Sequence, residues 1–131
     1  MKNFFCFLFL CLLLLQACTY DPPKAKMTII NHSANPVWVN VSVDECDTFP
    51  VLNSIDMLAY IESNKSDSYI LNGTKKKPII PNKKQIITLF FIEDSVVRQY
   101  HMCEISKEKL FTKVVLTKDE LERDKYLYVY Q

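Results

Sequence analysis

The segment from Val37 to Val43 constrains the fold most, because a valine occupies every second position: Val-Trp-Val-Asn-Val-Ser-Val. Successive side chains of a β-strand point to opposite faces, so this alternation predicts a half-buried strand with all four valines on one face. Residues 86–92 read Ile-Ile-Thr-Leu-Phe-Phe-Ile, an almost continuous apolar run. We expect this run to be the most buried strand of the domain.

Turn-forming residues flank further strand patterns. Residues 27–31 are apolar, and the polar stretch 32–36 separates them from Val37, so we expect these two strands to form a hairpin. Asn72-Gly73 tolerates positive φ at both central positions of a turn and predicts a second hairpin after residues 67–71. Pro78 and Pro81 would confine the returning segment to a sheet edge or a loop.

The last third of the chain mixes helix and strand signals. Thr117-Lys-Asp-Glu120 has capping-box spacing and predicts a short helix through Arg123. Residues 104–110 favour another short helix, and the alternation of residues 126–130 predicts a closing strand. The sequence therefore predicts a mainly β domain, a small antiparallel β-sandwich of Ig-like or Greek-key type with two short helices near the C-terminus.

The N-terminus has the pattern of a secretory signal. Lys2 is followed by an apolar run from Phe4 to Leu15, which is too short for a comfortable membrane span. Leu15, Ala17 and Cys18 resemble the lipobox of bacterial lipoproteins. This resemblance implies cleavage after Ala17, lipidation of Cys18 and membrane lipid as a partner. We expect a signal peptide at 1–17, a lipid-anchored tether at 18–26 and a β-rich domain at 27–131.

The second half of the chain resembles a known group of proteins. The matching segments are Leu89–Asp94, Phe111–Thr117, Lys118–Leu121 and Tyr126–Tyr130. They are similar to the ending of small lipoproteins of Bacteroidota. The resemblance implies an envelope location and a β fold, and it implies no activity. We expect the outer membrane, with its periplasmic and surface faces both open.

The same bacterial group attaches O-glycans at an Asp-Ser/Thr-aliphatic motif. Asp94-Ser95-Val96 matches this motif, so the resemblance makes Ser95 a candidate O-glycosylation site. The alternative interpretation is a turn between Ile92 and Val97 in which Ser95 is unmodified.

Catalytic and cofactor-binding patterns are absent from the sequence. Gly73 is its single glycine, whereas phosphate-binding loops, dinucleotide fingerprints and nucleophile elbows need several. No local signature joins His32 or His101 to Cys46 or Cys103 as a nucleophile pair, and these residues fit no metal site of typical spacing. We therefore predict no enzyme, no metal and no cofactor.

Charged and cysteine residues leave several alternatives open. The 16 basic and 15 acidic residues nearly balance, so we expect no nucleic-acid partner. Cys46 and Cys103 are a candidate disulfide or two separate buried thiols. Residues 75–77 and 83–84 are lysines, which suit anionic lipid headgroups or acidic glycans, or a solvated loop at a sheet edge. The tyrosines of residues 126–130 share one face and suit either ligand binding or core packing.

The combined expectation is a non-catalytic envelope lipoprotein that presents a small β domain to a protein or glycan partner. The first alternative is an inhibitor or immunity-type lipoprotein directed against a lytic enzyme. The second alternative is a small hydrolase that uses cysteine or histidine.

Overall fold

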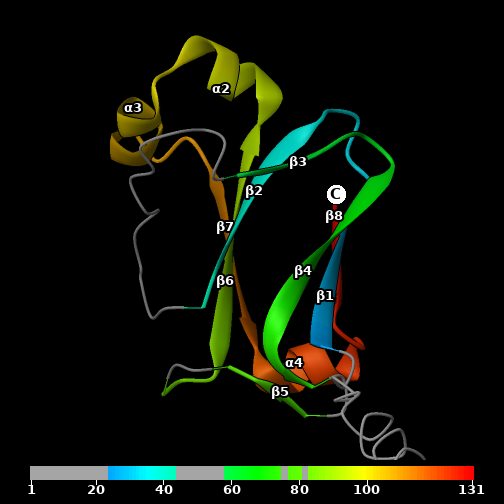
Figure 1. Cartoon of the computed structure of the whole chain (residues 1–131). Coiled ribbons are helices and arrows are strands. Elements are labelled where there is room, and N and C mark those ends of the chain that lie inside the picture. Colours follow the sequence, from blue (N-terminus) through cyan, green and yellow to red (C-terminus); the bar gives the residue numbers. More distant parts are fainter. Residues whose placement is uncertain (1–23, 44–57, 75–76, 81–82) are drawn as a thin grey trace, which may run out of the picture.

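Two four-stranded sheets pack face to face in the computed structural model, which describes residues 24–43, 58–74, 77–80 and 83–131 (Figure 1). Sheet A has the order β5 (Lys77–Ile79), β4 (Lys65–Thr74), β1 (Lys24–Asn31) and β8 (Leu127–Tyr130). Sheet B has the order β3 (Ala59–Ile61), β2 (Val37–Ser42), β6 (Ile86–Glu93) and β7 (Thr112–Thr117). Neighbouring strands are antiparallel except β1 and β8, which pair in parallel. The predicted β-sandwich is confirmed.

The main core lies between the two sheets. Met27 and Ile29 of β1 face Val37 and Val39 of β2, and all four side chains are buried. Val41 and Val43 pack against the same cluster, whereas Trp38 packs on the opposite face of sheet B. The valine face that the alternation predicts is therefore the core face of β2.

Strand β6 is buried on both of its faces, as its apolar run predicts. Leu89 and Phe91 point into the core between the sheets. Phe90 and Ile92 point the other way, into a second apolar cluster that includes Ile105 of helix α3. The helices α2 (Asp94–Gln99) and α3 (Met102–Lys107) contribute to this cluster at one end of sheet B (Figure 1).

The expected hairpin between the first two strands is wrong, because β1 lies in sheet A and β2 in sheet B. The side chain of Asn31, fully buried, holds the connection between the sheets. Its amide nitrogen donates to the carbonyl oxygens of Asn35 (2.8 Å) and Ile61 (3.0 Å), and its Oδ1 accepts from the backbone and hydroxyl of Ser33. These bonds make residues 32–36 an arch across the sandwich instead of a two-strand turn.

The second hairpin is present, but its turn lies later than Asn72-Gly73. These two residues remain in β4, where they pair with Ile79 and Pro78 of β5. The connection falls at residues 75–76, which lie outside the described part of the chain. Strand β5 is an edge strand, as Pro78 predicts. Pairing along the ladder therefore overrides the local turn preference of Asn-Gly.

The C-terminal part contains three short helices, one more than the sequence predicts. Helix α4 (Lys118–Arg123) begins at the predicted capping box, in which Thr117 and Glu120 exchange hydrogen bonds. Helix α3 overlaps the predicted helix at residues 104–110. Helix α2 was not predicted, because residues 94–96 were interpreted either as a glycosylation motif or as part of a turn. None of the helices in the described ranges is long and apolar enough to cross a membrane.

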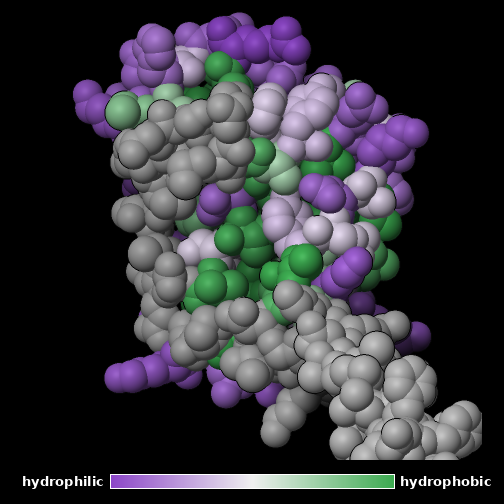
Figure 2. Space-filling view, viewed as in Figure 1, coloured by the Kyte–Doolittle hydropathy of each residue, from purple (hydrophilic) through white to green (hydrophobic). Residues whose placement is uncertain are grey.

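Strand β1 begins at Lys24, three residues before the expected start of the domain, and Ala25 is already buried in the core. Hydrophilic side chains cover the end of the molecule that carries α2 and α3, and apolar side chains show between the two sheets on the side of β3 and β4 (Figure 2).

Candidate functional site

An open groove of about 240 Å³ lies at the end of the sandwich where β6 and β8 end and β7 begins. Because its walls come from both sheets and from α2, the groove exists only in the folded sandwich. Its lining is mostly apolar with one acidic side chain: Phe91, Glu93, Val96, Leu110, Phe111, Thr112 and Tyr130.

Aromatic rings that are fixed by packing form the floor of the groove. Phe91 is 1% exposed, and its ring stacks on Tyr130 with centroids 4.3 Å apart and planes at 15°. Tyr128 stacks on the same ring at 5.6 Å. Phe111 meets Phe90 of the second cluster edge-on at 5.4 Å. Packing therefore holds the aromatic side chains that line the groove in place, and they need little ordering when a ligand binds.

The polar groups of the groove lie at its rim. Glu93 is exposed at the start of α2, and its Oε2 accepts a hydrogen bond from the Ser95 hydroxyl at 3.4 Å. Thr112 is exposed and pairs with Phe91 in the ladder between β6 and β7. A carboxylate beside aromatic faces suits the hydroxyl-rich edge and apolar face of a sugar, or a basic or apolar side chain of a protein.

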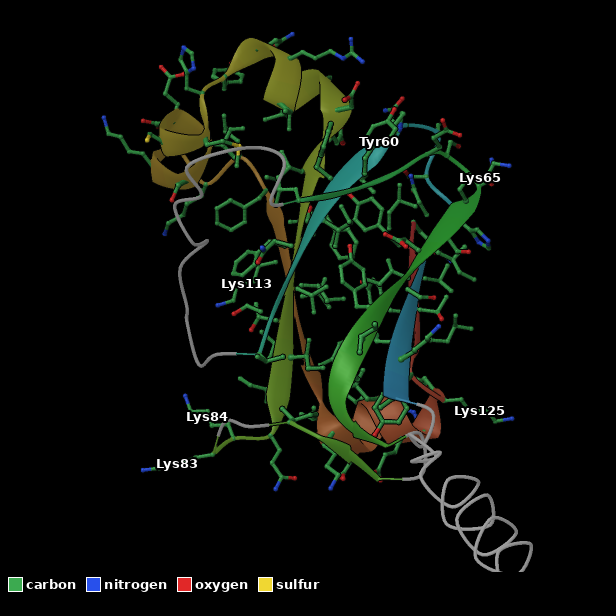
Figure 3. The ribbon with its side chains drawn as sticks, viewed as in Figure 1. Tyr60, Lys65, Lys83, Lys84, Lys113 and Lys125 are labelled. Carbon is green, nitrogen blue, oxygen red and sulfur yellow. The ribbon has the colours of Figure 1, made fainter. Side chains whose placement is uncertain are left out.

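A hydrogen-bond network positions helix α2 and hence one wall of the groove. The indole N–H of Trp38 donates to Oδ1 of Asp94 at 2.9 Å, and Nε of Arg98 donates to Oδ2 at 2.6 Å. The Trp38 bond, followed by the Arg98 bond, lowers the pKa of the Asp94 carboxyl below its ordinary value. Trp38 also packs against Tyr60 of β3, whose side chain is 42% exposed (Figure 3).

The predicted lipidation site lies outside the described residues, and so do Ala17 and Cys46. Cys103 is exposed on α3, so the alternative of two separate buried thiols does not describe it. The disulfide between Cys46 and Cys103 stays a prediction, as does the cleavage after Ala17.

The other residues singled out in the sequence are dispersed. Ser95 is exposed on the first turn of α2 beside the groove, so its glycosylation stays a prediction. His32 and His101 are both exposed, in the arch after β1 and before α3 respectively. Within the described ranges no three His, Cys, Asp or Glu side chains gather in a cluster that could hold a metal ion.

The three tyrosines near the C-terminus all pack against the core, and one of them also lines the groove. Tyr126 and Tyr128 pack against the core between the sheets, as their common face allows. Tyr130 packs there as well and also lines the groove. The packing interpretation therefore describes Tyr126 and Tyr128, and only Tyr130 is placed to meet a ligand.

Sequence reasoning missed Glu93, Phe111 and Thr112 as site residues. The only sequence pattern that they share is weak: each lies at one end of an apolar strand. The ends of different strands come together only in the folded sandwich.

Comparisons with protein-family models, curated proteins and solved structures find no match.

Proposed function

We propose that this chain is a non-catalytic lipoprotein of the cell envelope, anchored through acylated Cys18, that presents its groove to a protein or glycan partner. Leu15, Ala17 and Cys18 support the anchor at the level of sequence. The outer membrane is the proposed location, with either face open.

The observation that carries this proposal is the position of the groove relative to the start of the domain. Strands β1 and β8 run in parallel, so β1 begins at the end opposite to the one where Tyr130 closes β8 (Figure 1). A chain tethered ahead of Lys24 holds α4 near the membrane and the groove away from it. Its aromatic floor is then accessible to large partners.

The chemistry of the groove supports binding rather than catalysis. Among its lining residues, the one carboxylate is Glu93, and no cysteine or histidine is present. General acid–base or nucleophilic catalysis needs at least a nucleophile beside a base, or a pair of proton-transferring groups. Aromatic stacking beside a carboxylate is the arrangement of a recognition site.

The anchor is tested with Cys18→Ala in the native host, with Cys11→Ala as the matched control within the signal. We expect Cys18→Ala to lose the acylated N-terminal peptide in mass spectrometry and to leave the membrane fraction. Cys11→Ala should behave as the parent chain. An unmodified thiol at Cys18 in the parent protein contradicts the anchor.

The groove is tested by crosslinking in intact cells, with a photoreactive residue in place of Thr112 and, as a control, in place of Val115. Thr112 lines the groove, whereas Val115 is exposed on the outer face of the same strand. We expect a discrete adduct only from position 112. Equal adducts from both positions, or none from 112, contradict recognition at the groove.

The identity of the adduct separates the candidate partners. A polysaccharide adduct, together with retention on a column of that polysaccharide, indicates a glycan-binding protein. A lytic enzyme as the adduct, with protection of cells against that enzyme, indicates the inhibitor or immunity alternative.

A further inference from the structure

Strand β8 is an edge strand of sheet A, and half of its backbone groups face away from its neighbour β1. The carbonyls of Tyr126 and Tyr130 accept hydrogen bonds from the side of β1, both at 2.8 Å. Because the backbone groups of a strand alternate between its two sides, the N–H and C=O of Val129 point away from β1. The carbonyl of Leu127 and the N–H of Gln131 point the same way. Within the described part of the chain these outward groups have no partner.

The other three edge strands carry features that hinder the addition of a further strand. Strand β3 has only three residues, β5 contains Pro78, and β7 contains Lys113. Strand β8 reads Leu-Tyr-Val-Tyr and has neither a proline nor a charged residue. At its start, the N–H of Leu127 is already bonded to the carbonyl of Asp124 at 3.0 Å. Strand β8 is therefore the edge that is best suited to accept another strand.

The groove lies at the end of this edge, and Tyr130 belongs to both. The side chain of Tyr130 lines the groove, whereas its carbonyl is bonded to the side of β1. A residue of an added antiparallel strand opposite Tyr130 would therefore form a non-hydrogen-bonded pair with it. The two side chains of such a pair lie close together on the same face of the sheet. The side chain opposite Tyr130 would thus enter the groove.

The charge of the groove suits a lysine or an arginine at that position. The one charged lining residue is Glu93, whose side chain accepts a hydrogen bond from the Ser95 hydroxyl and forms no ion pair with any described residue. The methylene stem of a lysine or arginine packs on aromatic side chains such as Tyr130, and its cationic head then meets the carboxylate. A neutral apolar side chain would bury the groove and leave that carboxylate unmatched.

We infer that β8 and the groove together bind an extended segment of a partner protein, which pairs antiparallel to β8 and places a lysine or arginine in the groove. The inference rests on the proposed recognition at the groove, and it makes the partner a protein and not a glycan. Main-chain hydrogen bonds to Val129 hold the segment, and Glu93 selects the cation. Two copies of this chain paired through β8 around Val129 would instead place a tyrosine of the second copy opposite Tyr130 and leave Glu93 without a cation.

The first test uses the full chain and three synthetic peptides with blocked ends. The probe reads Thr-Thr-Thr-Lys-Thr-Thr-Thr. In one control glutamate replaces the lysine, and in the other proline replaces the threonine after the lysine, which removes the N–H that would donate to Val129. We expect the probe to slow amide hydrogen exchange at Val129 several-fold and the proline peptide to leave it unchanged. The glutamate peptide should bind about fivefold more weakly than the probe, which is the effect of an exposed ion pair. Equal effects of the three peptides, or no effect of the probe, overturn the inference.

Matched variants test the role of Glu93. Glu93→Gln should abolish the preference for the lysine peptide over the glutamate peptide. Asp119→Asn removes the same charge from an exposed position at the start of α4, outside the groove, and should leave that preference intact. A preference that survives in Glu93→Gln overturns the assignment of the cation to the groove.

The native partner is sought by crosslinking in intact cells from Thr112 in the groove and from Val129 on the edge. Ile70, which is 65% exposed on β4 of the same sheet, serves as the control. We expect the same protein from positions 112 and 129, attached through residues a few positions apart in one segment, and no adduct from position 70. Adducts from position 129 to a second copy of this chain overturn the inference.

The outcomes at positions 112 and 129 separate this inference from the proposed function. A polysaccharide adduct at 112, or a protein adduct at 112 with none at 129, overturns the added strand and leaves recognition at the groove standing. No adduct at 112 contradicts the proposed function. The three peptides then decide the inference by themselves, because their effect on Val129 is measured on the isolated chain.

Discussion

The indole of Trp38 and the carboxylate of Asp94 form a 2.9 Å hydrogen bond across 56 residues of sequence. The bond joins β2 to the first residue of α2, and the backbone N–H of Asp94 also donates to the Pro36 carbonyl at 3.1 Å. Helix α2 is thus fixed twice at its start. Because α2 contributes Val96 to the groove, this pair links the packing of sheet B to the shape of the candidate site.

Replacing Asp94 by asparagine should make stability less dependent on acidic pH. The folded-state pKa of Asp94 lies below its ordinary value of 3.8, chiefly because Trp38 donates to the carboxylate. The stabilisation is therefore complete above about pH 4 and is lost as the pH falls through the folded-state pKa. We expect urea unfolding to show Asp94→Asn less stable by about 0.5–1.5 kcal/mol near neutral pH, with the difference shrinking towards about pH 2. A constant difference contradicts this assignment.

Replacing Asn31 by alanine should destabilise the domain by about 2–3 kcal/mol. The variant loses both donors of the side-chain amide and leaves the carbonyl of Ile61, in a buried bond, without this partner. His32→Ala, a change at the exposed neighbouring position, should stay within about 0.5 kcal/mol of the parent. Denaturant unfolding of both variants checks the prediction, and similar small effects would show that the arch does not depend on Asn31.

Replacing Tyr69 by phenylalanine should leave stability unchanged or raise it by up to about 1 kcal/mol, because the buried hydroxyl has no hydrogen-bond partner among the described residues. Burial, aided by the nearby charge of Asp67, raises the pKa of Tyr69 above its ordinary value of 10.0. The folded state therefore resists deprotonation, and stability is lost as the pH rises above about 10. Tyr69→Phe should lose less stability there, whereas Tyr100→Phe, at an exposed position, should follow the parent.

Removing the capping hydroxyl of Thr117 should cost about 1 kcal/mol. The Thr117 hydroxyl accepts from the backbone N–H of Glu120 at 3.3 Å, and alanine leaves that donor without its partner. Thr117→Ser retains the hydroxyl and should retain most of the stability. Thermal unfolding of the two variants distinguishes the cap from a loss of strand propensity, which would lower the melting temperature in both.

Replacing Lys109 by glycine should stabilise the domain by about 0.5–1 kcal/mol. Lys109 follows α3 with a φ of 55°, a left-handed conformation that a Cβ atom disfavours. The next residue closes the helix, since the N–H of Leu110 donates to the Ile105 carbonyl at 3.0 Å. Lys107→Gly, at the last residue of α3, should destabilise by up to about 1 kcal/mol instead. Destabilisation by both changes would contradict this role of Lys109.

Only part of the candidate site was predictable from the sequence. Tyr130 follows from the alternation of the last strand, and Ser95 from a short motif beside the groove. Phe111 and Thr112 begin one strand while Glu93 ends another, and nothing within a few residues of each indicates that they converge. Helix α2, which forms one wall of the groove, was not predictable from nearby residues either. Its position depends on Trp38, which lies in a strand far away in the sequence.

The sequence by itself determined which face of each strand is apolar and where α4 begins. The valines from Val37, the apolar run through Phe91 and the capping pair at Thr117 involve residues within a few positions of one another, and local geometry decides such patterns. The tertiary structure decided which strands pair. Strands β1 and β2 belong to different sheets, and the hydrogen bonds of Asn31 hold the connection between them. Asn72 and Gly73 pair within the β4–β5 ladder and do not form the turn. Pairing depends on the burial of side chains far apart in sequence, and no local preference encodes that free energy.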